Sequence, residues 1–274
     1  MRSIAKLMKD WQFTGPNGVT TAVELPHTWN ARDGQDGGND YWRGCCTYCT
    51  CFAAPVYDPA QQQVWLQFEG INASAAVLLN GQQLCTHDGG YSTFRVDLTN
   101  HLKDENLLAI SVDNRDNDTV YPQKADFTFY GGIYRDVSLL VVNKNHIALG
   151  HFGDTGVKIT PALQENSADI RVETLVEGSG TVTVELLDAE GRTVAKGEGE
   201  NASLHLDAPH LWNGVKDPYL YTCVVRLLQD GQPVDEVTTR VGLRSFSVDA
   251  KKGFFLNGKP YPLHGVSRHQ DRKG

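Results

Sequence analysis

The sequence contains no hydrophobic run approaching the roughly 20 residues that a membrane-spanning helix needs. It also lacks long segments in which apolar residues recur every three to four positions between capping residues, so we expect very little helix. Basic residues are in the minority, because 25 Lys and Arg stand against 33 Asp and Glu, for a formal net charge of −8. Nucleic-acid binding needs a basic surface. We therefore expect neither a nucleic-acid partner nor a membrane partner.

Six cysteines are present, and four of them stand close together at positions 45, 46, 49 and 51. Their spacing does not match a two-pair zinc site, and no histidine-rich segment follows them. A chain of 274 residues can bury a core without disulfide bonds. We interpret them as plain strand cysteines, with Cys49 and Cys51 on one side of a strand. Free cysteines and the lack of an apolar leader segment predict a cytoplasmic protein.

Short apolar runs separated by turn residues fill most of the chain. The runs 64–68 and 75–79 are rich in strand-forming residues, and Asn80-Gly81 after the second is a strong hairpin signal. Further predicted strands cover 107–112, 137–142, 169–176, 181–187 and 220–228. Many short strands with Gly, Asn and Asp turns are typical of β-sandwiches. The sequence therefore predicts an all-β fold.

The length suits two sandwiches, and a polar patch at 143–145 marks a boundary between them. The second sandwich, to residue 246, has the strand rhythm of an immunoglobulin-like domain but lacks its tryptophan-and-disulfide signature. A third unit begins at residue 247 with a predicted hairpin over 254–266 around Asn257-Gly258. Its last strand has no partner left in the chain, which suggests a piece of a larger protein.

Four segments, in order, resemble the family 2 glycoside hydrolases, the family of β-galactosidases and β-glucuronidases. The first is Leu25–Asn30 with Tyr41–Gly44, and the second is Tyr130–Val137. The third is Leu211-Trp212 with Pro218–Tyr221, and the fourth is Gly242–Arg244 with Leu256–Pro260 and Gly265–His269. The order and the spread over nearly the whole chain make the resemblance specific.

The resemblance implies a jelly-roll, galactose-binding-like sandwich over 1–143 and an immunoglobulin-like sandwich over 144–246. Residues 247–274 would be the first strands of a truncated (β/α)₈ catalytic barrel, which takes about 250 residues when complete. A retaining glycosidase of this kind uses two carboxyl groups about 5 Å apart. Both the acid/base and the nucleophile would lie beyond Gly274, so no residue of this chain is assigned a catalytic role.

The resemblance also supplies candidate substrate-binding residues. Asp126 would contact the terminal sugar and help to hold a sodium ion in the longer parent protein; its alternative is a loop-capping aspartate. His269, at the end of the first barrel strand, would contact the sugar, and Arg268 would support the site. Asp36 and Asn39 belong to a glycine-rich loop that would border the site, or form a surface turn.

The implied function is support of a parent β-galactosidase that hydrolyses terminal β-D-galactosides, with this chain itself inactive. A β-glucuronidase parent, a stand-alone carbohydrate-binding module and an adhesin-like structural protein are the alternatives. The resemblance also implies that the parent uses sodium and magnesium and forms a homo-oligomer. This chain itself is expected to require no cofactor. The acidic run 113–118 is interpreted as a solvated loop rather than a calcium site, because the glycine and distal glutamate of a calcium loop are absent.

Overall fold

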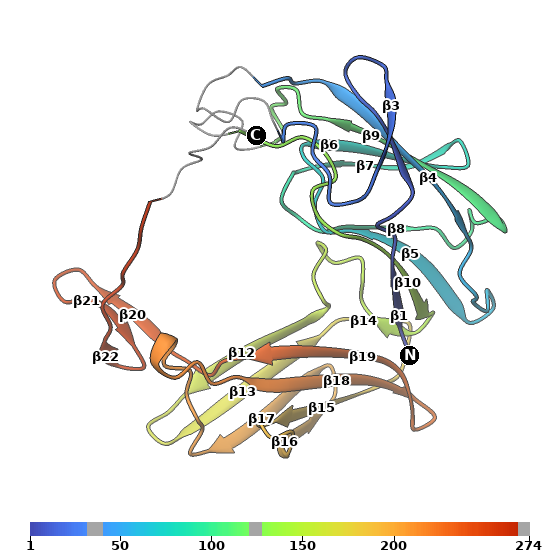
Figure 1. Cartoon of the computed structure of the whole chain (residues 1–274). Helices are drawn as coiled ribbons and strands as arrows, with labels where there is room; N and C mark the ends of the chain where they lie inside the picture. The colour runs from blue at the N-terminus through green and yellow to red at the C-terminus, as the bar shows by residue number, and fades with distance from the viewer. Residues whose placement is uncertain (32–40, 121–127, 268–274) are drawn as a thin grey trace. The chain divides into compact units, whose positions relative to one another are not determined.

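A computed structural model describes residues 1–31, 41–120 and 128–267 of the chain (Figure 1). Strands dominate, which confirms the predicted all-β class, and the described residues contain one short 3₁₀ turn, Gly214–Lys216. No helix in these ranges is long and apolar enough to cross a membrane. The chain forms two compact units: Ser3–Val142, here called the first sandwich, and Asn143–Val266 with Met1–Arg2, here called the second sandwich.

Two sheets build the first sandwich. One has four strands in the order β1 (Ser3–Lys6), β10 (Val137–Asn143), β5 (Gln62–Phe68) and β8 (Phe94–Asp97). The other has six strands in the order β3 (Thr20–Val23), β2 (Trp11–Thr14), β4 (Cys45–Ala53), β9 (Glu105–Asp113), β6 (Ser74–Leu79) and β7 (Gln82–Asp88). Both sheets contribute side chains to one hydrophobic core, as expected of a sandwich.

Alternation along the strands decides which side chains enter that core. In β6 every second residue is buried, and the turn to β7 places Asn80 and Gly81 at φ 54° and 84°, as the predicted hairpin requires. In β4, Cys46 is buried, whereas Cys49 and Cys51 lie on the other, more exposed side of the strand. The predicted common side of these two cysteines is confirmed, and all six cysteines are free thiols.

The second sandwich has the same plan with different strands. A three-stranded sheet, β12 (Val157–Leu163), β13 (Ser167–Thr174) and β17 (Asn201–Asp207), contributes to one core with a four-stranded sheet. The latter runs β16 (Thr193–Glu198), β15 (Thr181–Leu187), β18 (Tyr221–Gln229) and β19 (Gln232–Val241). A small sheet pairs β11 (His146–Ile147) with β14 (Val176–Glu177).

A separate three-stranded sheet follows: β20 (Phe246–Asp249), β21 (Gly253–Leu256) and β22 (Lys259–Pro260). Its turn at Asn257-Gly258 has positive φ at both residues, as predicted. The returning strand is shorter than predicted, because residues 261–267 carry no strand, and the expected barrel stub is not evident there. A barrel strand takes its hydrogen bonds from parallel neighbours, and the described residues offer none to this segment.

Candidate functional site

The predicted substrate-binding residues fall in segments that the structure does not describe. Asp36 and Asn39 lie within 32–40, Asp126 lies within 121–127, and Arg268 and His269 lie within 268–274, all outside the described residues. Their roles, including the sodium contact of Asp126, therefore stay predictions. The described residues that flank the first two segments form the candidate site.

A single buried asparagine joins those flanks. The Asn30 side chain is fully buried, and its Oδ1 accepts hydrogen bonds from the backbone N–H of Gly131 at 2.8 Å and from Asn114 Nδ2 at 3.1 Å. Its Nδ2 donates to the carbonyl oxygen of Trp42 at 3.0 Å. The residues before and after segment 32–40 and those after segment 121–127 are thus fixed to the same side chain. A buried amide with its hydrogen bonds satisfied holds loops rigidly.

Asn114 extends this set of hydrogen bonds to the end of β9. We call the side chains of Asn30 and Asn114, with the groups they bond, the clamp. Its Oδ1 accepts from the backbone N–H of Gly44 at 2.8 Å, and its own N–H donates to the carbonyl oxygen of Gly44 at 3.2 Å. Beside it, Arg43 Nη1 donates to Asp116 Oδ1 at 2.7 Å. The Tyr41–Gly44 motif is therefore bonded to the loop after β9, at the start of β4.

The glycines of the Tyr130–Val137 motif allow a very close approach of chain segments. A Cβ atom on Gly131 would stand 2.2 Å from Cζ2 of Trp29, so any side chain there would collide with the indole. Gly132 has φ +132°, and its Cβ would meet the carbonyl oxygen of His27 at 2.5 Å. Gly132 also exchanges two backbone hydrogen bonds of 3.1 Å with Asn72. Only glycine fits at both positions.

The Leu25–Asn30 motif contacts the same glycines from the other side. Thr28 Oγ1 donates to the carbonyl oxygen of Gly131 at 2.7 Å, and the His27 N–H donates to Ile133 at 2.8 Å. The His27 Nδ1 lies 2.7 Å from the Tyr48 hydroxyl. Burial lowers the pKa of His27 and raises that of Tyr48. The structure therefore brings together motifs about 100 residues apart, into one rigid end of the first sandwich.

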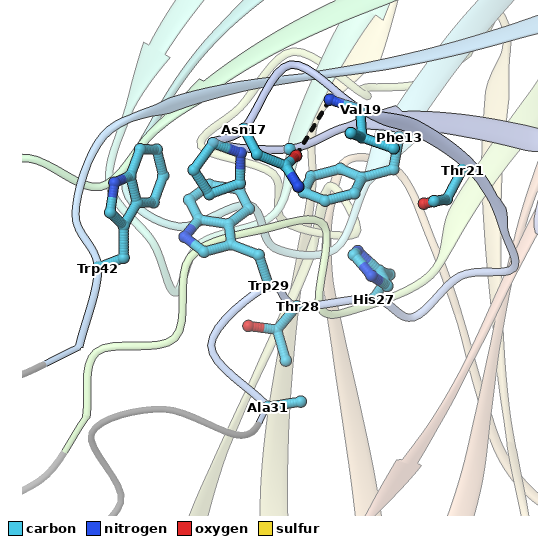
Figure 2. Close-up of a pocket in the computed structure, with 11 residues that line it drawn as sticks. Phe13, Asn17, Val19, Thr21, His27, Thr28, Trp29, Ala31 and Trp42 are labelled. Carbon is cyan, nitrogen blue, oxygen red and sulfur yellow. Dashed lines mark hydrogen bonds between the residues drawn. The ribbon is translucent and has the colours of Figure 1, made fainter.

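A groove of about 530 Å³ opens next to this clamp (Figure 2). Its aromatic walls are Phe13 and Trp29, whose rings lie 6.0 Å apart at 14°, and Trp42, whose ring stands at 71° to that of Trp29. The other lining residues are small or polar and uncharged: Gly15, Pro16, Asn17, Val19, Thr21, His27, Thr28 and Ala31. We name this feature the Trp29–Trp42 groove.

The sequence reasoning did not identify this groove. It noted Trp29 and Trp42 only as parts of motifs, and it gave no role to Phe13 or Asn17. The one available signal was the turn sequence Gly15-Pro16-Asn17-Gly18, which marks a hairpin tip beside an aromatic residue. Nothing in the local pattern showed that this tip lies beside Trp29 and Trp42 of the first motif.

The third and fourth motifs meet in the second sandwich. Asn257 Nδ2 donates to the carbonyl oxygen of Trp212 at 3.0 Å and to Asn213 Oδ1 at 2.8 Å, and its Oδ1 accepts from the Ser245 N–H at 2.9 Å. The Arg244 guanidinium lies 4.6 Å from the centre of the Trp212 ring, a cation–π contact. These motif residues join the small sheet β20–β22 to the sandwich before it.

Metal binding finds no support in the described part of the chain. Across residues 1–31, 41–120 and 128–267, no three His, Cys, Asp or Glu side chains converge as ligands. In the loop 113–118, Asp113 pairs with Arg115 of the same loop, and Asp116 pairs with Arg43 of the Tyr41–Gly44 motif. The predicted sodium site depends on Asp126, for which there is no described geometry.

Two protein-family models match the chain in series. The model described as "Glycosyl hydrolases family 2, sugar binding domain" matches residues 10–143, and the model described as "Glycosyl hydrolases family 2" matches residues 151–244. Among curated proteins, a β-glucuronidase of Bacteroides fragilis is 36% identical over 97% of this chain and 41% of its own length. A β-galactosidase of Bacteroides ovatus is 33% identical over 96% of this chain and 34% of its own length.

Solved structures give the same picture. An FMN-binding β-glucuronidase from Facaelibacterium prausnitzii L2-6 superimposes with a TM-score of 0.93 at 38% identity, over 100% of this chain and 44% of that one. A structure described as a putative β-galactosidase from Bacteroides fragilis gives a TM-score of 0.89 at 36% identity, over 98% and 45%. The chain therefore spans less than half the length of these relatives.

Proposed function

Because this chain belongs to family 2 of the glycosyl hydrolases, we propose that it is the N-terminal, non-catalytic part of an exo-acting β-glycosidase. The observation that carries the proposal is the pair of family models matched in order, sugar-binding domain first, over residues 10–143 and 151–244. The likeness to a family member with a TM-score of 0.93 over the whole chain supports it. The first sandwich would take part in carbohydrate binding, and the second sandwich would hold the first in position.

The chemistry of a retaining glycosidase requires two carboxyl groups about 5 Å apart, one as acid/base and one as nucleophile. We propose that both are supplied by residues outside this chain. The role of the present residues is then to hold the loops that border the substrate. The buried Asn30 suits that role, because it fixes both flanks of segment 32–40 and one flank of segment 121–127.

For the terminal sugar we propose a β-glucuronide, with a β-galactoside as the second candidate. The sequence reasoning placed the galactoside first. The names of the relatives favour the reverse order, since the 36% identical Bacteroides fragilis protein and the 38% identical solved structure are both called β-glucuronidases. A uronate needs a cationic partner for its carboxylate, and we propose that this partner also lies outside the present chain.

Turnover of aryl β-glycosides tests both parts of the proposal. The glucuronide, galactoside, glucoside and mannoside would be offered to the purified chain and to the longer gene product that contains it. We expect no turnover by the chain, and glucuronide turnover by the longer protein. Saturable hydrolysis by the chain alone, with host enzymes excluded, would refute the non-catalytic role. Preference of the longer protein for the galactoside would reverse the order of the two substrates.

The sodium and magnesium requirement and the homo-oligomer remain part of the proposal for the longer protein. Activity after dialysis against a chelator, with and without added sodium or magnesium, tests the ions. Sedimentation velocity at several concentrations tests the assembly, and a monomer at the highest concentration would count against it.

A further inference from the structure

We propose that the Asn17-Gly18 peptide is a site of spontaneous deamidation, and that the fold protects the other Asn-Gly pairs of the chain. The pairs that share this reactive sequence are Asn17-Gly18, Asn80-Gly81, Asn213-Gly214 and Asn257-Gly258. The modification converts an asparagine amide into a carboxylate, and water is its only co-reactant. The proposed glycosidase role has no part in this reaction, which involves the present chain alone.

The reaction begins when the backbone nitrogen of Gly18 loses its proton to solvent and attacks Cγ of Asn17. A bond forms between that nitrogen and Cγ, the bond from Cγ to Nδ2 breaks, and Nδ2 leaves as ammonia. Water then opens the resulting succinimide ring, at Cγ to give aspartate or at the backbone carbonyl carbon to give isoaspartate. The new carboxyl group passes its proton to the ammonia, so one negative charge is gained without oxidation or reduction. Glycine favours the attack because it has no Cβ to obstruct it.

The hydrogen bonds of the asparagine side chain distinguish Asn17 from the other three. Ring closure requires the amide group to turn toward the next backbone nitrogen, so bonds that hold the amide elsewhere oppose it. The Asn17 side chain is exposed, and its one hydrogen bond within the described residues is accepted by Oδ1 from the Val19 N–H at 3.0 Å (Figure 2). This bond folds the side chain over the following peptide, beside the nitrogen that attacks it.

Asn80 and Asn257 are held at both ends of the amide. Asn80 Nδ2 donates to the His101 carbonyl oxygen at 3.2 Å and to Asn106 Oδ1 at 3.0 Å, and Asn80 Oδ1 accepts from the Leu107 N–H at 3.0 Å. Asn257 also makes three hydrogen bonds, two through Nδ2 and one through Oδ1. All of these bonds must break before either amide can turn toward its glycine.

Asn213 is protected by its own bonds and by the burial of its glycine. Its Nδ2 donates to the Leu211 carbonyl oxygen at 3.2 Å, and its Oδ1 accepts from Asn257 Nδ2 at 2.8 Å. Gly214 is buried, and a Cβ there would stand 2.2 Å from the Tyr261 hydroxyl oxygen. The backbone at Gly214 therefore has little room for the change of shape that ring closure imposes.

The attacking nitrogen at Gly18 is restrained by a local turn. Its N–H donates to the Gly15 carbonyl oxygen at 3.0 Å, and this bond must open before attack. The turn lies at an exposed hairpin tip next to the edge strand β3, which pairs with β2 alone, and such tips open locally at low cost. A Cβ on Gly18 would meet nothing within 4 Å, but the same holds for Gly81 and Gly258. The side-chain bonds therefore decide between these three pairs.

Peptide mass spectrometry of the purified chain, incubated in mildly alkaline buffer, tests the assignment. Deamidated peptides gain the mass difference between a carboxyl and an amide group, and the aspartyl and isoaspartyl forms separate on reversed-phase chromatography. Digestion under mildly acidic conditions prevents conversion during handling. We expect Asn17 to convert roughly tenfold or more faster than the other three asparagines, because each additional hydrogen bond makes the open state rarer.

Two controls separate the effect of the fold from that of the sequence. The chain unfolded in guanidinium chloride should convert all four pairs at similar rates, because the same Asn-Gly sequence is then equally accessible. Asn17→Gln should abolish the conversion and leave the urea midpoint unchanged, since the side chain is exposed. This variant also assigns the mass change to Asn17 rather than to Gln12 or Asn30 of the same stretch.

Several outcomes would overturn the inference. In the folded chain, these are conversion of another Asn-Gly pair as fast as Asn17, or an Asn17 peptide that stays unmodified while the unfolded chain converts at all four pairs. The same order of rates in the unfolded chain, or conversion that persists in the Asn17→Gln variant, would also overturn it. None of these outcomes depends on hydrolysis by the longer protein, so failure here and failure of the proposed function are separable.

Discussion

Replacement of Arg2 by alanine should destabilise the second sandwich, although Arg2 is the second residue of the chain. Asp235 in β19 is fully buried, and its carboxylate accepts from Arg2 Nε at 2.7 Å and from Arg2 Nη2 at 2.5 Å. The N–H of Ile147 donates to the same carboxylate at 2.8 Å, and Arg2 Nη2 also donates to the Ile147 carbonyl oxygen at 3.1 Å. The arginine thus neutralises a carboxylate that has no access to water.

The expected loss follows from the charge left behind. Arg2→Ala would leave Asp235 buried with one backbone donor, and breaking a buried ion pair by removing one partner costs about 3–5 kcal/mol. With a urea dependence of about 2 kcal/mol/M for a sandwich of this size, the midpoint should fall by roughly 2 M. Because the chain has two compact units, only the transition of the second sandwich should move.

Urea unfolding of each variant measures this shift. The fluorescence of Trp212 reports on the second sandwich. The double variant Arg2→Ala with Asp235→Ala should be more stable than the Arg2→Ala variant, since it removes the unpaired charge. Lys6→Ala is the matched control: Lys6 pairs with Asp136, but its side chain is 63% exposed, so only a small loss of stability is expected. A loss of that small size for Arg2→Ala would refute the reasoning.

Three shorter predictions concern other features. Gly131→Ala should destabilise the first sandwich by about 1–3 kcal/mol, because its Cβ would collide with an indole, whereas Gly265→Ala, with nothing within 4 Å, should be neutral in urea unfolding. Hydrogen bonds to two neighbouring aspartates raise the pKa of His205 above 6.5; their contribution to stability is present below pH 6.5 and is lost as pH rises through the raised value. An NMR titration giving a pKa at or below 6.5 would contradict this. Burial raises the pKa of Cys46 to about 12, so iodoacetamide should alkylate the exposed Cys51 first and Cys46 only after unfolding, as mass spectrometry would show.

The strands could be predicted because their signals are local. The run 75–79 alternates toward one core, and Asn80-Gly81 supplies the positive φ values that its turn needs. The order of strands within each sheet is a different matter. β1 pairs with β10, so residues 3–6 meet residues 138–141, and no local pattern encodes that pairing. The same limit explains the missing strand at 261–266, whose apolar residues suit a strand only where neighbours exist to bond it.

The site illustrates a further limit, because a family motif shows family membership more readily than it shows what each residue does. Asn30 reads as a turn residue in sequence, yet it is fully buried and bonds to Gly131, 101 positions away, and to Asn114, 84 positions away. A buried amide that forms hydrogen bonds to distant residues leaves no periodicity or composition in the sequence that a pattern could detect. Gly131 likewise reads as a flexible residue, whereas it is required because an indole lies against its Cα. Within the described residues, these motif positions hold other parts of the fold in place.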